Sequence, residues 1–86
     1  MAKVKVEWTE DALYDLEKLD PPVQKRILRK ISWFREYFIN QTPEHLSGEL
    51  KEFFKIRIGD WRVIYKLEKN TIVIHAVGHR KDIYKY

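Results

Sequence analysis

The spacing of apolar residues divides the first half of the chain into one short strand and two helices. Residues 4–8 alternate between apolar and polar side chains, which is the period of a half-buried strand. Thr9 is a favourable N-cap, and apolar residues then recur at helical spacing until about Asp20, which predicts a first helix. Asp20 is followed by two prolines, so a second helix is predicted to start there and to run to about Phe38. Its apolar stripe comprises Val23, Ile27, Ile31, Phe34 and Phe38.

The second half of the chain contains a predicted β-hairpin. Residues 54–58 and 61–67 alternate on either side of Gly59 and Asp60, and glycine in the first loop position suits a type II′ turn. Cross-strand partners share a face of a sheet, so this turn sorts the side chains of the hairpin into two sets. The apolar face holds Phe54, Ile56, Ile58, Trp61, Val63, Tyr65 and Leu67. The other face holds Phe53, Lys55, Arg57, Arg62, Ile64 and Lys66.

The predicted register sets Arg57 opposite Arg62. Like charges placed directly opposite each other destabilise a pair of strands. Two splayed surface arginines would be the structural alternative, but the repulsion argues against it. We therefore expect this pair to bind an anion.

A third strand and the predicted loops complete the fold. Residues 71–77 are rich in β-branched side chains and predict the third strand of the second half, after a turn at residues 68–70. Residues 40–50 are predicted to be a loop, and residues 78–84 a loop or short terminal segment. The order β-α-α-β-β-β predicts an α+β fold, with two helices packed on one face of a mainly antiparallel four-stranded sheet. Residues 1–86 form a single domain.

Charge is distributed unevenly along the 86 residues, whose net charge is +4. Residues 1–50 carry 8 Lys or Arg and 9 Asp or Glu, whereas residues 51–86 carry 9 and 4. A polyanion-binding face would show such an excess on the hairpins, and a solvated basic surface is the alternative. Four cations lie off the apolar stripe of the second helix and are better explained as a solvated face than as RNA contacts. They are Lys25, Arg26, Arg29 and Lys30.

Composition also excludes several classes of protein. The chain has no cysteine, so disulfides and thiolate metal sites are impossible. Its three histidines, His45, His75 and His79, give no convincing metal site, and we expect neither a metal nor another cofactor. No apolar run is long enough to span a membrane, and the first residues lack the apolar region of a signal peptide. We expect a soluble, cytoplasmic protein without membrane partners.

Several cations and titratable groups in the second half suit phosphate chemistry. In metal-free RNA cleavage, a base takes the proton of the ribose 2′-OH, which attacks the adjacent phosphorus, and an acid protonates the departing 5′-oxygen. Arginine stabilises the phosphate because its planar fork is always charged and grips two oxygens. Lysine and tyrosine act as bases only if neighbouring cations lower their pKa, whereas histidine titrates near neutrality. The candidate residues are Lys55, Arg57, Arg62, His79, Arg80 and Tyr84.

Two sequence strings carry a resemblance to a known family. One runs from Arg57 through Gly-Asp-Trp-Arg to Tyr65, and the other runs from Val77 through Gly-His-Arg to Tyr84. With more generic matches in the helices and at Leu46-Ser-Gly, the chain resembles the RelE side of the RelE/ParE toxin superfamily over nearly its whole length. The resemblance implies a RelE-like fold and a toxin of a type II toxin-antitoxin system. It further implies a ribosome-dependent mRNA endoribonuclease (mRNA interferase) that inhibits translation and is held inactive by a cognate antitoxin.

The resemblance also implies roles for individual residues. Arg62 and Arg80 would hold the scissile phosphate, and Lys55 and Arg57 would stabilise charge or assist proton transfer. Tyr84 would stack on a base or serve as the general base. His79 would act as acid or base. The RNA-binding set comprises Lys55, Arg57, Arg62, Lys66, Arg80 and Lys81.

Alternatives from other functional classes remain open at this point. The chain is either the ribonuclease, a ParE-like inhibitor of DNA gyrase, or a non-catalytic nucleic-acid-binding module whose affinity falls steeply with salt. For the toxin, the expected partners are the antitoxin, the ribosome and mRNA. The free toxin is expected to be monomeric and to form a hetero-oligomer with the antitoxin. Trp33 and Tyr37 are expected to be partial core or part of an antitoxin groove.

Overall fold

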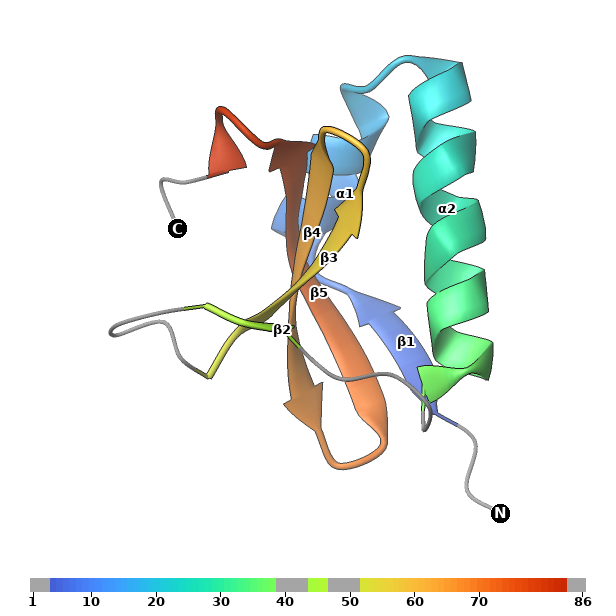
Figure 1. Cartoon of the computed structure of the whole chain (residues 1–86), viewed down its shortest axis with the longest axis vertical. Helices are drawn as coiled ribbons and strands as arrows, with labels where there is room; N and C mark the ends of the chain where they lie inside the picture. The colour runs from blue at the N-terminus through green and yellow to red at the C-terminus, as the bar shows by residue number, and fades with distance from the viewer. Residues whose placement is uncertain (1–3, 39–43, 47–51, 84–86) are drawn as a thin grey trace.

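The computed structural model describes residues 4–38, 44–46 and 52–83, which form two helices and one five-stranded sheet (Figure 1). The strand order is β1-β5-β4-β3-β2, with β1 parallel to β5 and every other pair antiparallel. The elements are β1 (Lys5–Trp8), α1 (Glu10–Glu17), α2 (Pro21–Glu36), β2 (Glu44–His45), β3 (Phe54–Ile58), β4 (Trp61–Glu68) and β5 (Thr71–His79). The predicted α+β fold is confirmed, since the four longer strands and the two helices are those expected.

Two strand boundaries differ from the prediction. Within the segment predicted as a loop, Glu44–His45 pairs with Phe54 and Lys55 of β3. A strand of two residues is too short to show any alternation, so the sequence carries no signal for it. The last strand continues through Gly78 to His79, because the residues at the start of β4 supply pairing partners up to that point. The prediction that residues 78–84 leave the strand was therefore wrong for the first two of them.

The hairpin between β3 and β4 has the predicted register, including Arg57 opposite Arg62 and Ile58 opposite Trp61. Gly59 has a φ of 61°, which is the positive value that the first loop position of a type II′ turn requires. A side chain is strained in that conformation, so glycine is needed there. The hairpin turn, Gly59–Asp60, thus follows directly from the local sequence.

The N-terminal strand and first helix are joined to β5 by polar contacts. The Thr9 hydroxyl accepts a hydrogen bond from the Ala12 amide at 3.1 Å, which confirms Thr9 as the N-cap of α1. The Thr9 amide donates to the Ile74 carbonyl at 3.0 Å, where β1 ends. Beyond that point, the carboxylate of Asp15 accepts the Val77 amide at 3.1 Å. The Asp15 side chain therefore replaces a strand partner at this part of the edge of β5, where the described residues supply none.

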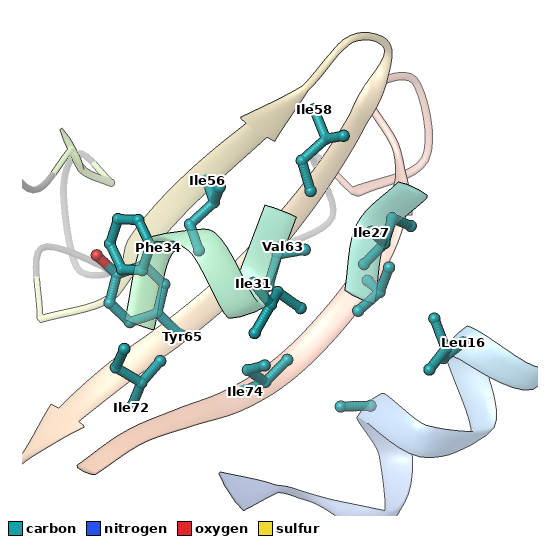
Figure 2. Close-up of a cluster of buried hydrophobic side chains, with 12 residues drawn as sticks. Leu16, Ile27, Ile31, Phe34, Ile56, Ile58, Val63, Tyr65, Ile72 and Ile74 are labelled. Atoms are coloured by element: carbon teal, nitrogen blue, oxygen red, sulfur yellow. The ribbon is translucent and has the colours of Figure 1, made fainter. Parts of the chain in front are cut away.

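Apolar side chains from both helices meet one face of the sheet, and Figure 2 shows this core. α1 contributes Ala12 and Leu16, and α2 contributes Ile27, Ile31 and Phe34. The sheet contributes Ile56, Ile58, Val63, Tyr65, Ile72, Ile74 and Val77. The members from α2, β3 and β4 lie where the apolar pattern predicts, so the helices cover the face that the hairpin leaves apolar.

Tyr65 is the largest fully buried side chain of this core. Its ring stacks on Phe54 with centroids 5.3 Å apart and meets the edge of Phe34 at 5.5 Å. Its hydroxyl has no hydrogen-bond partner among the described residues, and burial raises the pKa of Tyr65 to about 12. Tyr65 lies in the core and Trp61 packs against it, which confirms the prediction that both belong to the apolar face of the hairpin.

Candidate functional site

The face of the hairpin opposite the core carries the predicted cations. Arg57 and Arg62 are cross-strand partners, and Lys55 is paired with Ile64 two positions further from the turn. Lys66 follows on β4, where its ammonium lies 3.2 Å from a carboxylate oxygen of Glu52 and 4.7 Å from the centroid of the Phe53 ring. The structure therefore gathers four of the six predicted RNA-binding residues on one face.

Arg62 is held against the turn from which its strand starts. Its Nη1 donates to the carbonyl of Gly59 at 2.7 Å and to the carbonyl of Trp61 at 2.9 Å. A guanidinium has five N–H donors, so these two bonds leave others for a bound oxyanion. The contacts fix the direction of the guanidinium at the end of the hairpin without neutralising its charge.

Arg80 reaches the same turn from the end of β5. Its main-chain amide donates to the Asp60 carbonyl at 2.7 Å, and its Nε lies 3.5 Å from Oδ1 of Asp60. Both side chains are more than half exposed, so this ion pair adds at most a few tenths of a kcal/mol to about 1 kcal/mol to stability. Its effect is positional, because one two-residue turn holds the two arginines assigned to the scissile phosphate.

His79 lies on the other side of the sheet from Arg62. It pairs with Trp61, whose ring packs against the core, and the two rings meet edge to face with centroids 5.3 Å apart. Nδ1 of His79 accepts the main-chain amide of Lys81 at 3.2 Å. In the neutral ring the proton is therefore assigned to Nε2. The structure does not bring His79 onto the cationic face.

The remaining predicted site residues follow β5. Lys81 is exposed, next to Arg80 in the turn that ends the described chain. Tyr84 lies outside the described residues, so its role stays a prediction. In the part of the chain that the structure describes, no three His, Asp or Glu side chains are grouped to hold a metal ion. Within the same residues, neither helix is long and apolar enough to cross a membrane.

Comparison with known proteins identifies the family. A family model described as the ParE toxin of type II toxin-antitoxin system, parDE, matches residues 6–84. This chain belongs to the ParE/RelE family of type II toxins. It is 36% identical over 86 residues to Toxin RelG of Mycobacterium tuberculosis (strain ATCC 25618 / H37Rv), covering 93% of this chain and 94% of the relative. The resemblance inferred from the sequence is confirmed.

Solved structures agree with this family assignment. The toxin-antitoxin complex RelBE2 of Mycobacterium tuberculosis includes a chain with a TM-score of 0.80 and 27% identity, covering 92% of this toxin and 100% of that chain. The isolated RelE toxin of E. coli has a TM-score of 0.72 and 19% identity, covering 95% of this toxin and 92% of that chain. At this lower identity the similarity shows the fold alone.

Two features of this ParE/RelE-family toxin were missed by sequence reasoning. Asp60 was assigned only to the turn, yet it binds Arg80 through both its carbonyl and its carboxylate. Cations of α2 also lie next to the hairpin, where Arg26 packs against Gly59. The second feature had a signal in the sequence, since Arg26, Lys30 and Trp33 recur at helical spacing.

Proposed function

We propose that this toxin is a metal-independent endoribonuclease that cuts mRNA on the ribosome and thereby inhibits translation. The observation that carries the proposal is the pair of arginines on one turn. Arg62 lies on β4 and Arg80 directly follows β5, and both contact the hairpin turn: Arg62 through the carbonyls of Gly59 and Trp61, and Arg80 through the carbonyl and carboxylate of Asp60. A gyrase inhibitor that binds protein would have no need for this constellation.

The proposed reaction is an internal transesterification. The 2′-oxygen forms a bond to the adjacent phosphorus while the bond from phosphorus to the 5′-oxygen breaks. A base removes the proton of the 2′-OH, and an acid delivers a proton to the departing 5′-oxygen. Arg62 and Arg80 grip the phosphate oxygens, where charge develops in the transition state. Lys55 and Arg57 extend this positive field along β3.

Proton transfer is assigned to residues at the end of the chain. Tyr84 is proposed as the general base or as a platform for a base of the RNA. His79 is proposed as an acid or base, acting through Nε2 because Nδ1 is occupied by the Lys81 amide. In this assignment His79 reaches RNA around the hairpin turn rather than across the cationic face. Lys66 and Lys81 contribute charge to RNA binding.

A cognate antitoxin is the proposed protein partner. The relatives of M. tuberculosis and of archaeal sources were solved as toxin-antitoxin or RelB-RelE complexes. We propose that the free toxin is a monomer, that it forms a hetero-oligomer with the antitoxin, and that it acts in the cytoplasm, where ribosomes translate. An acidic, partly disordered antitoxin that folds on binding would complement the basic face of the hairpin.

Cleavage on programmed ribosomes tests the proposed activity. Wild-type toxin should cut mRNA without added metal, and Arg62→Ala should lower the cleavage rate about 100-fold or more, because it removes a donor to the developing phosphate charge. Lys25→Ala is the matched control, since it removes one exposed cation from α2 and should leave the rate unchanged. Equal rates for the wild type and Arg62→Ala would contradict the assignment of the phosphate site.

Inhibition of DNA gyrase is the second candidate function, and the match to the ParE toxin description over residues 6–84 favours it. The same preparations are therefore added to a gyrase supercoiling assay. Blocked supercoiling together with no mRNA cleavage would replace the ribonuclease proposal. A non-catalytic nucleic-acid-binding module would produce neither activity, and its binding would survive loss of any one cation and fall steeply with salt.

A further inference from the structure

A surface groove separates α2 from the β3–β4 hairpin, on the side where the hairpin turn lies beside the helix. Its volume is about 490 Å³. It is lined by Arg26, Arg29, Lys30, Trp33, Arg57, Ile58 and Gly59. Figure 1 shows α2 running beside the hairpin. The helix contributes Arg26, Arg29, Lys30 and Trp33 to the lining of the groove.

The described residues that line the groove are rich in positive charge. Four of these seven residues are cations, and among them none is acidic. Arg26 packs against the hairpin turn: a methyl group on Gly59 would lie only 2.7 Å from the guanidinium of Arg26. Arg57 belongs both to the groove and to the cationic face. The groove is therefore continuous with the proposed phosphate site, around the edge of β3.

An aromatic stripe extends the same side of α2. Trp33 and Tyr37 are 41% and 44% exposed, and their rings lie 5.4 Å apart. The ammonium of Lys30 lies 4.1 Å from the centroid of the Trp33 ring. Positions 26, 30, 33 and 37 fall on one helical stripe, which places cations first and aromatic rings after them. Trp33 and Tyr37 were expected to be partial core or part of an antitoxin groove. Neither belongs to the buried cluster or packs against it, and the antitoxin groove stays a prediction.

We propose that this groove binds single-stranded RNA, with phosphates on Arg26, Arg29, Lys30 and Arg57 and a base stacked on Trp33. A cationic groove combined with exposed aromatic rings is how proteins hold single strands without reading sequence. The inference rests on the proposed function, in which the groove guides the RNA strand on one side of the scissile phosphate. An acidic protein segment would use the cations but would have no need for a stacking ring beside them.

The binding test uses a fluorescein-labelled, 2′-O-methylated oligouridylate, which lacks the nucleophile and so cannot be cut. Four phosphate contacts predict a slope of log affinity against log salt of about −2.8, or about 50-fold weaker binding between 50 and 200 mM salt. The variant Arg26→Gln/Arg29→Gln should reduce the slope to about −1.4, or about 7-fold. Lys18→Gln/Lys25→Gln is the control, because it removes two exposed cations outside the groove and should keep the wild-type slope.

A second variant separates RNA from other polyanions. Trp33→Leu should weaken binding of the oligouridylate at least 5-fold, since stacking of a base contributes about 1–3 kcal/mol, and should leave binding of inorganic polyphosphate unchanged. The RNA assignment is overturned if Trp33→Leu has no effect and poly-glutamate competes as well as the oligonucleotide. It is also overturned if the arginine variant keeps the slope of the control.

The groove and the nuclease can fail separately. The oligonucleotide assay contains no ribosome and no cleavable bond, so its result does not depend on catalysis. If mRNA is cut on ribosomes but the Arg26→Gln/Arg29→Gln variant binds the oligonucleotide like the control, only the groove proposal is contradicted. Groove-dependent RNA binding without any mRNA cleavage would remove only the nuclease.

Discussion

Replacing Tyr65 by phenylalanine should stabilise this toxin and change how its stability depends on pH. The Tyr65 side chain is 0% exposed, and its hydroxyl lacks a partner within the described part of the chain. A buried hydroxyl that loses its water and gains no hydrogen bond costs about 1–3 kcal/mol in protein mutational data. Tyr65→Phe keeps the ring contacts to Phe34 and Phe54 and removes that penalty. We expect the free energy of unfolding at pH 7 to rise by about 1 kcal/mol.

The pH dependence follows from the raised pKa. Burial raises the pKa of Tyr65 from its ordinary value of 10.0, which applies to the unfolded chain, to about 12 in the folded chain. Because the folded value is higher, the contribution to stability is fully present below pH 10 and is lost as the pH rises toward 12. Between pH 7 and pH 11 the wild type should lose about 1.4 kcal/mol through this group, and Tyr65→Phe should not.

Urea unfolding at pH 7 and pH 11 measures both effects. Because the stability of the whole chain responds to pH, the quantity of interest is the difference in the free energy of unfolding between the wild type and Tyr65→Phe at each pH. Tyr14→Phe is the matched control, because Tyr14 is 60% exposed and water solvates its hydroxyl in the folded and the unfolded chain. The reasoning is refuted if the wild type and Tyr65→Phe lose the same stability between the two pH values.

Three further substitutions test local contacts by chemical denaturation. Thr9→Ala removes the cap of α1 and should lower the free energy of unfolding by about 1 kcal/mol, with Thr9→Ser close to wild type. Asp15→Ala leaves the Val77 amide without its acceptor and should lower the free energy of unfolding by about 1–3 kcal/mol. Faster hydrogen exchange of the Val77 amide in this variant checks that the lost contact is the cause. Asp15→Asn keeps an acceptor and should lower the stability less. Gly59→Ala should cost about 1 kcal/mol or more, because φ is 61° there and the new methyl displaces the Arg26 guanidinium; a stability equal to wild type would contradict the assigned turn.

The local parts of the fold were predictable from the sequence, and the long-range parts were not. The Gly59–Asp60 turn fixes the pairing of Arg57 with Arg62 through neighbouring residues alone. In contrast, the pairing of β4 with β5 contains a β-bulge, because Ile64 pairs with Ala76 and Tyr65 with Ile74, which leaves His75 as an extra residue. The alternation of residues 71–77 gives no sign of this register shift, because the shift depends on how β5 pairs with β4 on either side of the bulge.

The candidate site divides in the same way. The shared face of Lys55, Arg57 and Arg62 follows from strand alternation and was predicted. The contact between Asp60 and Arg80 was not, because it depends on β5 ending beside the hairpin turn, 20 residues further along the chain. His79 can be placed only if the strand is known to continue through Gly78. The glycine and the polar residues after it instead indicate the end of the strand. Side-chain chemistry was thus easier to predict than the meeting of distant segments.

The position of β5 between β1 and β4 has a consequence for the order of folding. β5 pairs with β4 on one side and with β1 on the other. In the second pairing, Lys5 is the partner of Thr71 and Trp8 is the partner of Ile74, so β1 cannot join the sheet before β5 is available. Contacts between residues so far apart in sequence form late and slow folding, because the intervening chain must first be ordered. The core face stays incomplete until β5 has been synthesised, since Ile72, Ile74 and Val77 all lie on that strand. A growing chain therefore has no finished toxin domain until its last strand emerges, and a partner that recognises the folded sheet meets it only then.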